Sequence, residues 1–245
     1  MRTFSTFALA AGVLATVVTL SVASSAAQAP AGAEQMVAAL KQNLEKSQQR
    51  LRQYEWIETT SISLKGEEKS RKQQRVYYGA DGKLTKVPVG EPPEASQGGG
   101  GGGRRGGRVK QRIVENKKDE MQDYMERAVA LIHLYVPPSP ATIQKAKDAG
   151  KMLLRPPSQG SVRVEFPEFI QPSDLMAIEV DAKALLLSSL SVATYLEKPE
   201  DTVTLNVRFG ALGDGTGYSA RTTLDAKAKN ITVVVENSGH RPLAP

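Results

Sequence analysis

The chain has 245 residues, 40% of them hydrophobic and 24% charged, which is typical of a globular protein and is enough for one large domain or two small ones. Cysteine is absent, so disulfides, thiol nucleophiles, thiolate metal sites and a lipid-modified cysteine are excluded. Residues 98–118 contain seven Lys and Arg against one acid, an excess of +6 that equals the formal net charge of the whole chain. The rest of the chain is therefore close to neutral, and its folded surface is not basic.

The N-terminus has the pattern of a secretory signal peptide. Arg2 precedes an uncharged stretch over residues 3–33, and small residues at Ser25 and Ala27 fit a cleavage site. Cleavage after Ala27 would start the mature chain at Gln28, and export without disulfides favours a bacterial periplasm. The alternative is an uncleaved membrane anchor, because the uncharged stretch is long enough to span a bilayer.

Next, residues 33–53 carry apolar side chains at helical spacing and predict an amphipathic helix. From Tyr54 the period changes to two, which predicts strands over residues 54–64, 69–78 and 84–89, with turns between them. Trp56, the only tryptophan, lies in the first of these strands. We interpret it as an anchor of the sheet core, with a ligand contact as the alternative.

From Pro88 the composition changes to proline, glycine and arginine, and it predicts a disordered insert at about residues 90–112. Arginine-glycine segments bind nucleic acid, but no aromatic residue is interleaved here and export separates the chain from RNA, so we expect no nucleic-acid partner. Weak contact with anionic envelope surfaces through Arg104, Arg105 and Arg108 is the binding role that this insert allows.

Two helices are predicted after the insert. Over residues 119–136 an apolar stripe includes Met121, Met125 and Ile132, and two prolines end the helix. Ser139 caps a second helix that ends near Gly150. A short segment around residues 155–157, Arg-Pro-Pro, closes this helical insert.

The remainder reads as an antiparallel meander. Strands are predicted over residues 162–170, 175–181, 185–195, 203–209, 218–224 and 231–235, where apolar and polar side chains alternate or β-branched residues gather. Asp214 lies between glycines, and we interpret this segment as a hairpin turn and not as a calcium or catalytic loop.

The sequence contains few residues in patterns typical of catalytic or metal-binding sites. His133 and His240 are the only histidines and do not form a metal-binding pair, and no nucleophile elbow or phosphate loop occurs. We therefore expect no metal, no cofactor and no enzymatic activity.

The order of these elements, the passage LRQYEW at residues 51–56 and the last three strands with Asp214-Gly215 resemble the LolA/LolB-like superfamily of periplasmic lipoprotein carriers. The N-terminal domain of the RseB/MucB regulators of envelope stress is similar. The resemblance implies an α+β fold, in which a curved antiparallel sheet forms an incomplete β-barrel covered by an N-terminal helix and a two-helix insert. It also implies an apolar cavity for acyl chains, in a single domain over residues 28–245.

The first functional hypothesis is an exported, non-enzymatic protein that binds a lipid or lipoprotein acyl chain. Its candidate ligand contacts are Trp56, Met121, Met125 and Ile132, because flexible methionines can pack around acyl chains of different shape. The alternative for these residues is that they are ordinary core. The second hypothesis is a periplasmic sensor or scaffold module that binds a protein partner through a sheet edge or loop. An enclosed apolar cavity would favour the first hypothesis, and a filled interior would favour the second.

Overall fold

The computed structural model describes residues 31–90, 107–158 and 160–243. The side chains of residues 31–38 and 107–118 are outside this description. The predicted signal peptide and most of the predicted insert, with Arg104 and Arg105, also lie outside the described residues, as does the side chain of Arg108.

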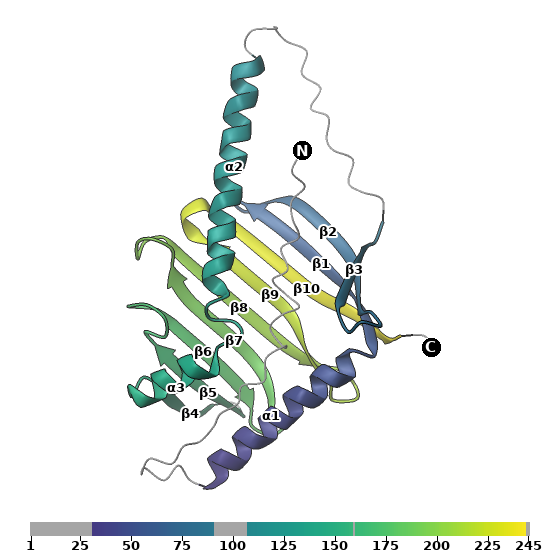
Figure 1. Ribbon diagram of the computed structural model, residues 1–245, viewed down its shortest axis with the longest axis vertical. Helices are drawn as coiled ribbons and strands as arrows, with labels where there is room; N and C mark the ends of the chain where they lie inside the picture. Colours follow the sequence, from purple (N-terminus) through teal and green to yellow (C-terminus); the bar gives the residue numbers. More distant parts are fainter. Residues whose placement is uncertain (1–30, 91–106, 159, 244–245) are drawn as a thin grey trace.

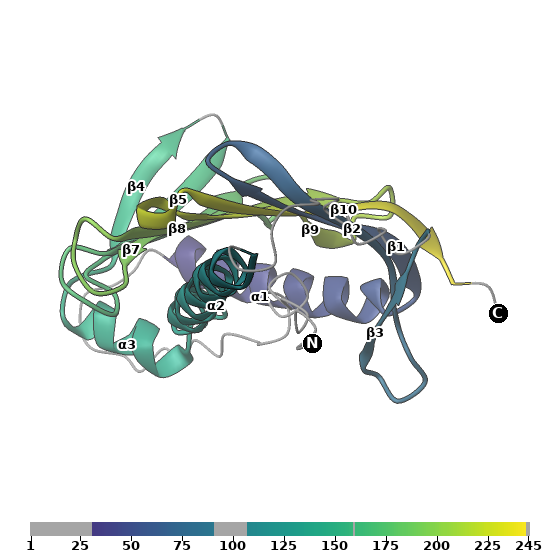
Figure 2. The ribbon, with the colours of Figure 1, turned by 90° about the horizontal axis from the view of Figure 1, so that it is seen from above.

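Within the described residues, ten antiparallel strands form one open sheet with helices on one face (Figures 1 and 2). The helices are α1 (Ala31–Leu51), α2 (Gly107–Ile132), α3 (Pro140–Asp148) and the short η1 (Lys227–Lys229). The strands are β1 (Tyr54–Leu64), β2 (Glu67–Tyr78), β3 (Leu84–Pro88), β4 (Leu153–Ser158), β5 (Ser161–Pro167), β6 (Leu175–Asp181), β7 (Leu186–Tyr195), β8 (Thr202–Ala211), β9 (Gly217–Ala226) and β10 (Ile231–Pro242).

The strand order is β3-β2-β1-β10-β9-β8-β7-β6-β5-β4, so every neighbour is also a neighbour in sequence except β1 and β10. The sheet does not close into a barrel, because β3 and β4 remain as its edges. This confirms the predicted α+β class and the curved, incomplete antiparallel barrel covered by an N-terminal helix and a helical insert. The face that carries α1, α2 and α3 is called the helix-covered face below, and the opposite side is the outer face (Figure 2).

Alternation along the strands places the apolar side chains on the helix-covered face. Val203, Leu205 and Val207 of β8 are each at most 1% exposed, whereas the intervening Asn206 and Arg208 are exposed on the outer face. The main core joins these strands to buried side chains of α2, namely Tyr124, Met125, Ala128 and Ile132. Burial of such side chains contributes about 1.5–3 kcal/mol each and is what holds α2 on the sheet.

Two of the differences from the sequence-based expectation concern α2 and β4. The helix α2 begins at Gly107, so residues 107–112, expected in the disordered insert, are helical. The glycine and arginine content dominated that prediction, although Lys, Gln and Arg favour a helix. The strand β4 was not predicted, because Pro156 and Pro157 lack backbone N–H groups. Proline is tolerated there since β4 is an edge strand.

Within the described part of the chain, no helix is both long enough and apolar enough to cross a bilayer.

A buried carboxylate joins the loop after β5 to the end of α2. Asp174, 2% exposed, accepts hydrogen bonds from the backbone N–H groups of Phe169, Ile170 and Gln171. It also accepts the hydroxyl proton of Tyr135 at 2.6 Å, and burial together with this bond raises the pKa of Tyr135 well above its usual value. One carboxylate therefore fixes the connection between the helical insert and the sheet.

Replacing Asp174 with asparagine should lower the free energy of unfolding by about 1–3 kcal/mol, because the amide NH2 group faces N–H donors that then lack an acceptor. For a chain of this size the midpoint of thermal unfolding should fall by roughly 2–10 °C. The matched control is Asp81→Asn, since Asp81 is exposed, accepts the backbone N–H of Lys83 and forms only an exposed ion pair with the ammonium group of the same residue, 3.9 Å away. Its effect should stay within about 0.5 kcal/mol. Equal midpoints for the two variants would contradict this role of Asp174.

Candidate functional site

Two separate apolar clusters lie on the helix-covered face. The main cluster contains the α2 side chains and the central strands, and it includes Met125 and Ile132. The smaller aromatic cluster consists of Leu51, Trp56 and Val76, with Tyr54, Tyr78, Leu84 and Tyr218 packed against it. The C-terminal end of α1 covers this second cluster through Leu51.

A row of polar side chains crosses the same face between the two clusters. Glu58 of β1 pairs directly with Gln74 of β2 and with Asn237 of β10, and it shares its face with Trp56, two residues away. The amide of Asn237 donates to the carbonyl oxygen of Ser219 in β9 at 2.9 Å. Glu58 is 3% exposed and Gln74 is 7% exposed. We call these four residues, Gln74, Glu58, Asn237 and Ser219, the polar row.

A buried ion pair belongs to this row. The Lys86 Nζ atom of β3 donates to both carboxylate oxygens of Glu58, at 2.6 and 2.8 Å. The side chains of Lys86 and Glu58 are only 14% and 3% exposed. Removing two charges from water costs free energy that their attraction does not always offset, so stability alone is a weak reason for such a pair.

The four candidate ligand contacts are not brought together. Trp56 belongs to the aromatic cluster, whereas Met125 and Ile132, 5% and 2% exposed, belong to the main cluster, and Met121 is half-buried beside it. Met125 and Ile132 lie in the main core because α2 presses them onto the sheet, which is the packing that the alternative of ordinary core describes. A ligand-binding role for any of the four stays a prediction.

Polar contacts attach α2 to one end of the sheet. Tyr124 donates its hydroxyl proton to Asp201, and Arg127 forms an ion pair with Glu197, so both partners belong to the turn between β7 and β8. Burial and the bond to Asp201 raise the pKa of Tyr124. Along the rest of its described side-chain contacts with the sheet, α2 relies on apolar packing.

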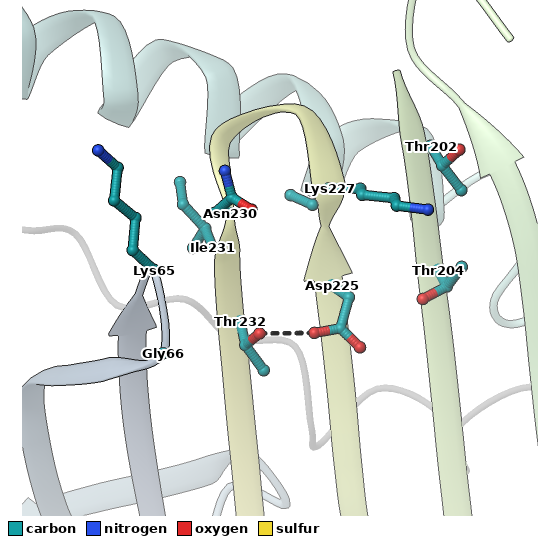
Figure 3. Close-up of a pocket in the computed structure, with 10 residues that line it drawn as sticks. Lys65, Gly66, Thr202, Thr204, Asp225, Lys227, Asn230, Ile231 and Thr232 are labelled. Carbon is teal, nitrogen blue, oxygen red and sulfur yellow. Dashed lines mark hydrogen bonds between the residues drawn. The ribbon is translucent and has the colours of Figure 1, made fainter. Parts of the chain in front are cut away.

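A polar groove of about 640 Å³ lies where β8 and β10 begin and β9 ends, beside the turn between β1 and β2 (Figure 3). Thr204, Asp225 and Thr232 are neighbours across these strands on the outer face, and Thr232 donates to Asp225 at 2.6 Å. Lys65 and Lys227 lie at its sides. Such a lining suits small polar groups and not an acyl chain. Sequence reasoning missed the groove because its residues come from separate turns and strands.

The end of β10 adds a histidine to the aromatic cluster. The ring of His240 stacks on Trp56, with 5.6 Å between centroids, and lies 4.1 Å from the centroid of Tyr218. Trp56 also donates its indole N–H to Asn237 at 3.0 Å. Burial lowers the pKa of His240 to about 4. Within the described ranges, no group of three or more His, Asp or Glu side chains is arranged to hold a metal ion.

No family model and no curated protein matches the chain. Among solved structures it is similar to a DUF1329 family protein from Desulfovibrio piger, with 13% identity, a TM-score of 0.40, and coverage of 88% of this chain and 94% of that one. It is also similar to a LolA superfamily protein from Nitrosomonas europaea, with 8% identity, a TM-score of 0.33, and coverage of 82% and 94%. The second is a member of the superfamily that the sequence resembles. At such TM-scores neither similarity transfers a ligand or an activity to this chain.

The pKa of His240 gives a pH dependence with a definite sign. Its folded-state pKa of about 4 lies below the usual value of 6.5. Between these two pH values His240 binds a proton in the unfolded chain but not in the folded protein. His240 therefore favours unfolding progressively as the pH falls from about 6.5 towards about 4. Between about pH 7 and pH 4.5 the wild type should lose more stability than His240→Phe, which keeps a ring in this place. Urea unfolding of both proteins measures this; parallel stability curves would contradict the assignment.

Proposed function

We propose that this chain is an exported envelope protein that binds an acyl chain on its helix-covered face. One observation carries the proposal: the apolar surface of that face extends beyond what the helices bury. Nine apolar side chains pack against the main cluster and remain partly exposed: Ile62, Leu64, Met121, Val129, Leu131, Val164, Ile178, Leu196 and Phe209. They come from α2, β1, β5, β6, β8 and the turn after β7, so they border the cluster on several sides.

The way in which α2 is held supports the same proposal. Its hydrogen bond and ion pair, through Tyr124 and Arg127, are both at the turn between β7 and β8, and the ammonium group of Lys229 in η1 lies over the ring of Tyr124. Its other described contacts with the sheet are apolar, and an acyl chain offers apolar contact of the same kind. Met121 and Met125 add side chains that repack easily. A ligand can therefore replace part of the packing under α2 without breaking a polar contact.

The test is binding of fluorescent acyl probes, one with a carboxylate and one with a neutral head. Ile62→Gln should weaken binding of whichever probe binds by at least about tenfold, because it places an amide on the apolar face. The matched control is Val234→Gln, on the outer face of the neighbouring strand and also partly exposed, which should stay within about twofold. Circular dichroism and thermal unfolding verify that both variants are folded. If the wild type binds neither probe, the proposal fails.

A second function, binding of a protein partner, is favoured by the edge strand β4. All six residues of β4 are exposed, and Leu154 is 65% exposed. Leu153 and Met152 beside it are 38% and 39% exposed, so three apolar side chains adjoin a free sheet edge. An edge strand can accept an added strand from a partner, here along residues 153–155 because Pro156 and Pro157 lack backbone N–H groups, and apolar side chains give the contact its specificity.

Under this second function, Leu154→Asp should abolish capture of a specific partner from an envelope extract. The control is Val87→Asp on the opposite edge strand β3. Val87 is also an exposed apolar residue of an edge strand, although at 37% it is less exposed than Leu154, and its replacement should not affect capture. Quantitative mass spectrometry compares the proteins captured by the wild type, by Leu154→Asp and by Val87→Asp. An unchanged set of proteins with Leu154→Asp would exclude β4 as the binding edge.

A further inference from the structure

We propose that the polar row, with the ion pair of Glu58 and Lys86, binds the head of the ligand and selects an uncharged one, such as a hydroxyl, ester or amide. This inference rests on the proposed function, since it assigns the polar end of an amphiphile whose acyl chain lies on the apolar side chains. Its basis is the position of two charges inside the helix-covered face, between two apolar clusters.

The row is directly beside the apolar surface. In β1, Glu58 is followed on the same face by Thr60 and then by Ile62, one of the partly exposed apolar residues. Successive residues on one face of a strand are about 7 Å apart, so Ile62 is about 14 Å along β1 from Glu58, a distance that a long acyl chain spans. An amphiphile can therefore contact the polar row and the apolar surface at the same time.

An unpartnered hydroxyl lies next to the row. Thr222 of β9 is 2% exposed, and its Oγ1 atom has no hydrogen-bond partner within the described chain. It pairs across the sheet with Val235, which in turn pairs with Thr60. A buried hydroxyl without a partner costs free energy, and a polar ligand group at this position would satisfy it.

The charges of Glu58 and Lys86 determine which polar head group of a ligand can bind at the polar row. Lys86 uses its ammonium group on both oxygens of Glu58, and a third N–H remains for a neutral acceptor. The pair has no net charge. A free carboxylate would add a second negative charge beside the buried carboxylate of Glu58, and like charges at short distance in a poorly solvated site repel strongly. An ester, hydroxyl or amide avoids this repulsion; all three accept hydrogen bonds, and the hydroxyl and the amide also donate.

The experiment compares a monoacylglycerol with the free fatty acid of the same chain length, each displacing a fluorescent reporter. The wild type should prefer the monoacylglycerol by at least about tenfold. Glu58→Gln leaves Lys86 uncompensated and should shift the ratio about tenfold or more towards the fatty acid, whereas Lys86→Gln should shift it further towards the monoacylglycerol. The control is Glu236→Gln, which breaks an exposed ion pair with Arg221 on the outer face and should leave the ratio unchanged.

The outcomes separate the two proposals. If neither amphiphile binds, the acyl-binding function fails; if both bind and the ratio is the same in all variants, that function stands and the head-group assignment is overturned. If one of the variants does not fold, the preference of the wild type for the monoacylglycerol over the fatty acid decides whether the head-group assignment holds. A monoacylglycerol with a photoreactive group on its glycerol should label the peptides that contain Glu58 or Lys86, and labelling confined to other peptides overturns the assignment.

Discussion

The pairing of β1 with β10 is the contact on which the rest of the structure depends. It joins the early strands of the chain to the last one and places both in the interior of the sheet. Without it, the unit of β1, β2 and β3 would separate from the other seven strands, and α1 would lose the continuous surface on which it contacts β1, β7 and β9. The same pairing brings Trp56 against His240 and aligns Glu58 with Asn237, so it creates both the aromatic cluster and the polar row.

Most of the fold could be predicted from the sequence, because the sheet is solvated on one face and covered on the other. Period-two alternation over residues 203–209 and 218–224 is enough to locate β8 and β9, and the change of period at Tyr54 locates β1. The edge strand β4 was missed because Pro156 and Pro157 are typical of a chain break. An edge needs hydrogen-bond donors on one side only, and which strand is an edge is a property of the whole sheet.

The candidate site was harder to predict, because neighbours on a sheet depend on register, which local patterns do not record. Trp56 and Met125 were grouped as apolar contacts, yet the polar row lies between their clusters. Glu58 only interrupts the alternation of residues 54–64, and Lys86 is 28 positions away in another strand. The ion pair becomes visible only when β1, β2 and β3 are placed side by side.

The central position of β10 also sets the order in which the chain can fold. This strand is synthesised after the other nine described strands, although it is the one that links β1 to β9. Contacts between residues far apart in sequence form slowly, because the entropy of closing a long loop is lost before the contacts are gained. Until β10 has emerged, β1 and β9 each keep a row of unsatisfied backbone groups, and such edges promote aggregation. A chaperone that shields these edges during synthesis would therefore raise the yield of folded protein.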